Sequence, residues 1–106
     1  MATAVEVGQV GERAVVNWLK GKGYNIDRWD TQSPGSTDIE ASTGSKRLLV
    51  QVKSALSPNL PAFLSDSEKK GITSRAARVG AEAWLAQVQL NSRLGLVGDI
   101  KWAKLN

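Results

Sequence analysis

Residues 37–54 read TDIEASTGSKRLLVQVKS, and this stretch decides the fold. Apolar and polar side chains alternate from Thr37 to Ser42, which is typical of a strand with one buried face. Thr43-Gly44-Ser45 is a turn signal, and the run from Arg47 to Ser54 is apolar enough for a central strand. The stretch therefore predicts a β-hairpin.

The polar side chains of this hairpin are placed to meet. Asp38 and Glu40 share one face of the first strand, and Gln51 and Lys53 share one face of the second. Pairing about the turn would make Asp38 a cross-strand neighbour of Gln51 and Lys53. We expect a carboxylate, a second oxygen ligand and an ammonium to converge at one end of the sheet.

A helix is predicted before the hairpin, from about Val5 to Lys22, and it ends at Gly21-Lys22-Gly23. Glu12 falls on the border of its apolar arc, where a purely solvated carboxylate is not expected. The residues of that arc are Val7, Val10, Gly11, Ala14, Val15, Trp18 and Leu19.

The other segments complete a mixed α/β pattern. A capping box, Ser65-Asp66-Ser67-Glu68, begins a second helix that stops near Gly80. We expect strands at Tyr24–Trp29, Ala83–Leu90 and Leu94–Leu105, and loops at Asp30–Gly35 and Ser57–Pro61. The pattern predicts one α/β domain over residues 1–106, a small mixed sheet flanked by helices.

Composition excludes several chemistries. The chain of 106 residues contains neither Cys nor His, which excludes disulfides, thiolate metal centres and catalysis by thiol or imidazole. Its net charge of +4 favours a polyanionic partner. With no apolar run of membrane-spanning length and no secretory signal in Met1–Gln9, we expect a cytoplasmic protein without membrane contact.

A hard metal ion is then the best source of hydrolytic chemistry. Phosphodiester hydrolysis needs a nucleophilic water and stabilisation of charge on the phosphoryl oxygens. A divalent cation held by carboxylate, amide and backbone oxygens does both, and a lysine beside it orients the water or neutralises developing charge.

The runs GSTDIEA (35–41) and LVQVKS (49–54) resemble the signature of the PD-(D/E)XK nuclease superfamily. The helix containing Glu12 resembles the first helix of its small members, the Holliday junction resolvases and Mrr-like nucleases. The resemblance implies a restriction-endonuclease-like αβββαβ core, Mg²⁺ dependence with Mn²⁺ as a substitute, and DNA cleavage. It makes Asp38 the metal-binding acid, Lys53 the catalytic lysine and Glu12 a helix-borne carboxylate. The carbonyl of Val52 becomes a further metal ligand.

Gln51 departs from the family pattern, in which Asp or Glu is more common at this position. An amide offers a neutral oxygen where a carboxylate offers a charged one. Q-x-K variants occur among Mrr-like members, and Glu40 is a candidate to restore the missing charge as a metal ligand.

Each of these residues also has a purely structural interpretation. Glu12 is then a surface acid paired with Arg13 or Lys20, Asp38 a turn acid, and Gln51 and Lys53 residues of a half-exposed strand. Glu40 is then solvated or paired with Lys46 or Arg47.

The tryptophans and the basic residues of the second helix have two interpretations as well. Trp18, Trp84 and Trp102 are predicted to be core residues, whereas Trp29 is a candidate contact for a base or a partner. The polar side of the second helix is either a solvated face or a stripe that contacts DNA phosphates. That side contains Lys69, Lys70, Arg75 and Arg78.

The leading hypothesis is a Mg²⁺-dependent endodeoxyribonuclease that acts as a homodimer, because one copy has one active site. A catalytically silent nuclease-fold module that binds nucleic acid or protein is the first alternative. A basic α/β interaction domain unrelated to nucleases is the second.

Overall fold

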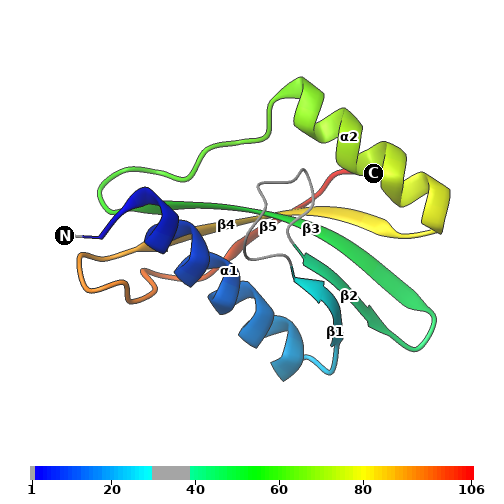
Figure 1. Cartoon of the computed structure of the whole chain (residues 1–106), viewed down its shortest axis with the longest axis horizontal. Coiled ribbons are helices and arrows are strands. Elements are labelled where there is room, and N and C mark those ends of the chain that lie inside the picture. The colour runs from blue at the N-terminus through cyan, green and yellow to red at the C-terminus, as the bar shows by residue number, and fades with distance from the viewer. Residues whose placement is uncertain (1, 30–38) are drawn as a thin grey trace.

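The structure is a computed structural model and describes residues 2–29 and 39–106. Its elements are two helices and five strands (Figure 1). In chain order these are α1 (Ala4–Gly21), β1 (Asn25–Trp29), β2 (Ile39–Thr43), β3 (Lys46–Leu56), α2 (Asp66–Val79), β4 (Glu82–Leu90) and β5 (Lys101–Lys104). The predicted α/β class and αβββαβ order are confirmed, and β5 lies within the last predicted strand, Leu94–Leu105.

Both helices begin with a capping box. Thr3 and Glu6 exchange side-chain and backbone hydrogen bonds at the start of α1, and Ser65 and Glu68 do the same for α2. The helix α2 ends at Gly80, whose left-handed backbone (φ 69°) suits glycine. Both predicted helices are therefore present.

The five strands form one sheet in the order β1-β2-β3-β4-β5. The strands β2 and β3 are the predicted antiparallel hairpin, in which Ile39 pairs with Val50 and Thr43 with Lys46. The turn uses Gly44 at a φ of 51°. The strands β3 and β4 pair in parallel, which requires the crossover through α2.

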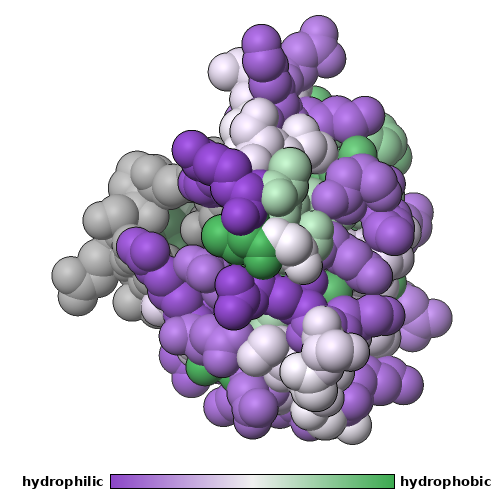
Figure 2. Space-filling model, turned by 90° about the vertical axis from the view of Figure 1, so that its right-hand side faces the viewer, coloured by the Kyte–Doolittle hydropathy of each residue, from purple (hydrophilic) through white to green (hydrophobic). Residues whose placement is uncertain are grey.

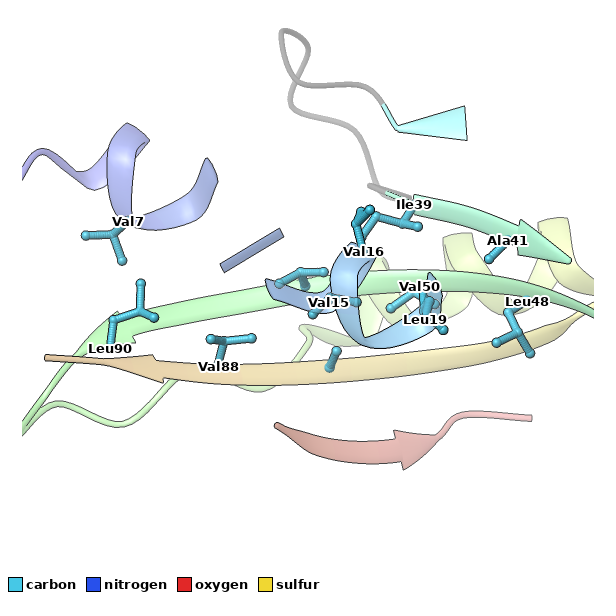
Figure 3. Close-up of a cluster of buried hydrophobic side chains, with 12 residues drawn as sticks. Val7, Val15, Val16, Leu19, Ile39, Ala41, Leu48, Val50, Val88 and Leu90 are labelled. Carbon is cyan, nitrogen blue, oxygen red and sulfur yellow. The ribbon is translucent and has the colours of Figure 1, made fainter. Parts of the chain in front are cut away.

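Each helix packs on its own face of the sheet, and the alternation along β3 divides the core. Leu48, Val50 and Val52 belong to the larger buried cluster, which includes Val15 and Leu19 of α1 (Figure 3). Leu49 belongs instead to the cluster around Ile72 and Ala76 of α2. These contacts define an α1 face and an α2 face of the sheet.

The structure corrects two details of α1. Val16 is only 2% exposed, so the buried side extends past the predicted arc, and Glu12 projects from within it. Trp18, predicted to be a core residue, is 40% exposed and packs on Trp102, whose ring also contacts Trp84. The three rings form a partly exposed cluster at the edge of the α1 face.

The last predicted strand was too long. Only Lys101–Lys104 pairs with β4 as β5, and the preceding segment contributes a single bridge between Leu90 and Leu96. Leu94 and Gly98 both have positive φ angles, of 63° and 68°, which an extended strand does not accommodate.

The end of the molecule that includes the β2–β3 hairpin is mostly hydrophilic, with a small hydrophobic area near its middle (Figure 2). Neither described helix combines the length and the apolar composition needed to cross a bilayer.

Candidate active site

Three of the predicted site residues project from the α2 face of the sheet. Glu40 pairs with Leu49, a residue of the α2 face, and side chains of paired residues lie on the same face. Gln51 and Lys53 follow Leu49 at every second position of β3. Gln51 is 5% exposed and Lys53 is half-buried. The sheet therefore groups Glu40, Gln51 and Lys53 on one side.

The described pairing between β2 and β3 ends just before Gln51. It runs up to the pair Ile39–Val50, whereas β3 continues along β4 to Leu56. Asp38, the predicted metal-binding acid, lies outside the described residues. Gln51, Val52 and Lys53 thus stand at the point where β3 extends past the described part of β2.

Lys53 contacts an acid that the sequence analysis did not include in the site. Its Nζ donates a hydrogen bond of 2.8 Å to Oε2 of Glu68, in the first turn of α2. The other oxygen, Oε1, accepts the backbone N–H of Ser65 at 3.0 Å. The bond from Lys53, and then that from Ser65, lower the pKa of Glu68 from 4.5 to about 2.

Glu12 reaches the sheet from its other face. Its carboxylate accepts a hydrogen bond of 3.0 Å from the indole Nε1 of Trp29, the last residue of β1. The guanidinium of Arg13, one of the partners expected for a surface Glu12, lies 5.9 Å from the centre of the same Trp29 ring. The indole that was a candidate base contact serves to hold this acid.

The glycine before Glu12 sets how closely α1 approaches β3. A Cβ at Gly11 would overlap Oγ of Ser54 and stand 2.9 Å from its Cβ. The helix therefore touches β3 at the residue that follows Lys53. Glu12 lies beside this contact on the α1 face, whereas Lys53 lies on the α2 face. The structure places the two residues near the same part of β3, on opposite sides.

Glu40 has a different partner from those predicted. Its carboxylate lies 3.8 Å from the guanidinium of Arg28 in β1, in a partly exposed ion pair. Lys46 pairs instead with Glu82 at 3.8 Å, and Arg47 donates to the carbonyl of Val79. The bulge in β1 between Ile26 and Arg28 lets Arg28 pair with Glu40 across the strands.

The basic residues of α2 divide into two kinds. Lys69, Lys70 and Arg78 are exposed. Arg75 is half-buried, and its Nη2 is buried without a hydrogen-bond partner among the described residues. Three of the four predicted phosphate contacts are thus open to solvent.

The donors of this region suit a hard cation by their chemistry. Glu12, Glu40 and Glu68 offer carboxylate oxygens, and Gln51 offers an amide oxygen, which are ligand types that Mg²⁺ takes. Within residues 2–29 and 39–106, however, no three acidic side chains gather closely enough to bind a metal ion.

Comparison with solved structures gives a strong likeness. No protein-family model and no curated protein matches the sequence. A solved structure, a Holliday junction resolvase from the archaeal hyperthermophile Archaeoglobus fulgidus, superposes with a TM-score of 0.70 at 25% identity, covering 92% of this chain and 77% of that one. This chain shares the fold of a Holliday junction resolvase. The predicted resemblance to the PD-(D/E)XK nuclease superfamily is thereby confirmed, and the sheet and its helices are those of a restriction-endonuclease-like fold.

Proposed function

We propose that this chain is a metal-dependent endodeoxyribonuclease that hydrolyses phosphodiesters in branched or duplex DNA. The observation that supports this most is the resolvase fold over 92% of the chain, with Gln51 and Lys53 on one face where β3 passes the described part of β2. The net charge of +4 suits a DNA substrate.

Asp38 and Gln51 are the proposed centre of the metal site. Asp38 directly precedes Ile39, which pairs with Val50, so one more step of this antiparallel register would set Asp38 opposite Gln51. Asp38, Gln51 and the Val52 carbonyl would hold Mg²⁺ or Mn²⁺, with Glu40 as an additional acid on the same face. Glu12 would be a further acid only by reaching the ion from the α1 face, where Trp29 holds it. A divalent cation in such a site lowers the pKa of water and neutralises phosphate charge.

Lys53 is the proposed catalytic lysine. Its ammonium would lie beside the scissile phosphate, orient the attacking water and stabilise the negative charge that develops on the phosphoryl oxygens. Water adds to phosphorus, the bond to the leaving oxygen breaks, and the leaving oxygen takes a proton. A half-buried ammonium acts more strongly here than one in bulk water.

The test is cleavage of a four-way junction, a duplex, single-stranded DNA and duplex RNA in Mg²⁺, Mn²⁺ or chelator. We expect metal-dependent cleavage of DNA, reduced at least 100-fold in Asp38→Ala and in Lys53→Ala. Lys46→Ala is the matched control, because Lys46 is also paired with a glutamate (Glu82) but lies on the hairpin. Full activity of Asp38→Ala or Lys53→Ala would overturn the site assignment.

A catalytically silent module that binds DNA is the second candidate, and Gln51 favours it because an amide supplies no charge to a metal. Such a module would bind DNA with a steep salt dependence and cleave none of the substrates in either metal. Metal-dependent cleavage excludes it.

We further infer a homodimer. One copy contains one Lys53, so cleavage of two strands at one junction needs two copies related by a two-fold axis. Sedimentation of the protein with and without a junction checks this, and two protomers per junction are expected.

A further inference from the structure

The Lys53–Glu68 contact joins two elements that are far apart in the sequence. Lys53 Nζ and Glu68 Oε2 are 2.8 Å apart, with side chains 27% and 34% exposed. The second oxygen of Glu68 accepts from the backbone of Ser65, whose own Oγ accepts the Glu68 N–H at 3.1 Å. The carboxylate is thus held at both oxygens, and its position relative to α2 is defined.

A helix cap alone does not require this arrangement. The capping box of α1 uses Glu6 in the same way, and Glu6 is exposed in the first turn of that helix. In α2 the same motif also places a carboxylate on Lys53, across the gap between helix and sheet. In α2 the carboxylate therefore makes a contact beyond those that begin the helix.

The uncharged residue at position 51 offers an explanation for the contact between Lys53 and Glu68. Gln51 and Lys53 lie two residues apart on one face of β3, so a carboxylate at position 51 would stand beside the ammonium. Gln51 supplies an amide instead. Glu68 supplies the missing negative charge from α2, on the same side of the sheet.

We propose that Glu68 is a positioning residue that holds the Lys53 ammonium for its reaction and replaces the carboxylate that Gln51 does not provide. The lysine stem is long and flexible, and its ammonium has three N–H donors. Glu68 takes one of them and fixes the stem, which leaves two donors for a phosphoryl oxygen or a water. This role rests on the proposed nuclease function.

The first test is Glu68→Gln, which keeps an oxygen to accept the Ser65 N–H and removes both the charge and the oxygen that accepts from Lys53. Asp66→Asn is the matched control, because Asp66 is an exposed acid in the same turn and its change in net charge is identical. We expect Glu68→Gln to lower kcat at least tenfold with KM within threefold, and Asp66→Asn to stay within twofold. A loss confined to KM, or activity of Glu68→Gln within twofold of the parent, would overturn the proposal.

The second test places a carboxylate at position 51 of β3 and removes the one at position 68. In Gln51→Glu/Glu68→Gln we expect kcat at least fivefold above that of Glu68→Gln. A double variant that melts at the parent temperature but recovers no activity contradicts the charge replacement.

A third measurement needs neither DNA nor metal. The ammonium of a lysine held in a hydrogen bond exchanges its protons slowly, so Lys53 should give a ¹H–¹⁵N correlation at low temperature, identified by its loss in Lys53→Ala. We expect the signal to vanish in Glu68→Gln and persist in Asp66→Asn. A signal that persists in Glu68→Gln would refute the contact. Loss of the signal in a protein that cleaves no DNA would refute the nuclease function while supporting the contact.

Discussion

Trp29 holds Glu12 by a hydrogen bond of 3.0 Å from its indole Nε1, and this bond ties α1 to the end of β1. Trp29 pairs with Ile39, and Ile39 pairs with Val50. The acid on α1 is therefore connected, through three adjacent strands, to the part of β3 that precedes Gln51 and Lys53. The bond places Glu12 at the sheet edge rather than in solvent.

Trp29→Phe tests the positioning of Glu12 separately from the stability of the fold. Phenylalanine keeps an aromatic ring and removes the N–H donor, so the free energy of unfolding should fall by about 1 kcal/mol. Cleavage should slow about tenfold as Glu12 loses its fixed orientation. Chemical denaturation and junction-cleavage assays measure the two effects.

Trp84→Phe is the control for that variant. Trp84 Nε1 donates to Glu82 Oε1, also at 3.0 Å, in β4, three strands across the sheet from β1. We expect a similar loss of stability with cleavage within twofold of the parent. Equal losses of activity in the two variants would show that the Trp29–Glu12 bond has no special role.

Local patterns predicted most of the fold. The structure contains the elements that three local signals predict. These signals are the alternation along residues 39–54, the capping box at Ser65 and the glycine at position 80, and each depends only on residues close together in the sequence. The β1 bulge was not predicted, and the last strand was predicted too long, because both features depend on pairing with distant strands. Positive φ angles at Leu94 and Gly98 leave little trace in the local pattern.

The site was less predictable for the same reason. Periodicity placed Gln51 and Lys53 on one face, but it carries no information on which side chain α2 brings to Lys53. Glu68 was visible only as a capping residue. The partner of Glu12 was missed because Trp29 lies 17 positions away and approaches through tertiary packing. The position of Gly11, one residue before Glu12, was the available signal for a close approach of helix and strand.

We expect Gly11→Ala to destabilise the protein and Gly8→Ala to stabilise it. At Gly11 a Cβ meets Ser54, including its Cβ at 2.9 Å, so helix or strand must shift, at a cost of about 2 kcal/mol. At Gly8 no atom lies within 4 Å of a Cβ, so only the gain in helix propensity remains, about 0.5–1 kcal/mol. Thermal and chemical denaturation should show changes in the free energy of unfolding of opposite sign for the two variants. A Gly11→Ala variant as stable as the parent would contradict the close packing of α1 on β3.

Glu68 should make stability depend on pH in the acid range. Its pKa is about 2 in the folded protein against 4.5 ordinarily, so the folded state binds fewer protons. The resulting stabilisation is fully present above pH 4.5 and is lost as the pH falls towards 2. We compare the free energies of unfolding of the parent and of Glu68→Gln in metal-free buffer. The parent should be the more stable of the two above pH 4.5, and the difference between their free energies should shrink as the pH falls towards 2. A difference that is constant from pH 7 to 2 would show that Glu68 is not held as a carboxylate.

The exposed lysines of α2 should contribute to DNA affinity without reading sequence or structure. Lys69 and Lys70 directly follow Glu68 in the chain, so a DNA strand bound at Lys53 would pass close to them. Each phosphate contact releases counterions, and loss of two should lower the slope of log K against log salt by about 2. We expect Lys69→Ala/Lys70→Ala to show this change with junction and duplex alike. Lys20→Ala/Lys101→Ala removes the same charge from exposed positions on α1 and β5 and should leave the slope nearly unchanged. Equal slopes for the two double variants would show that α2 does not face the DNA.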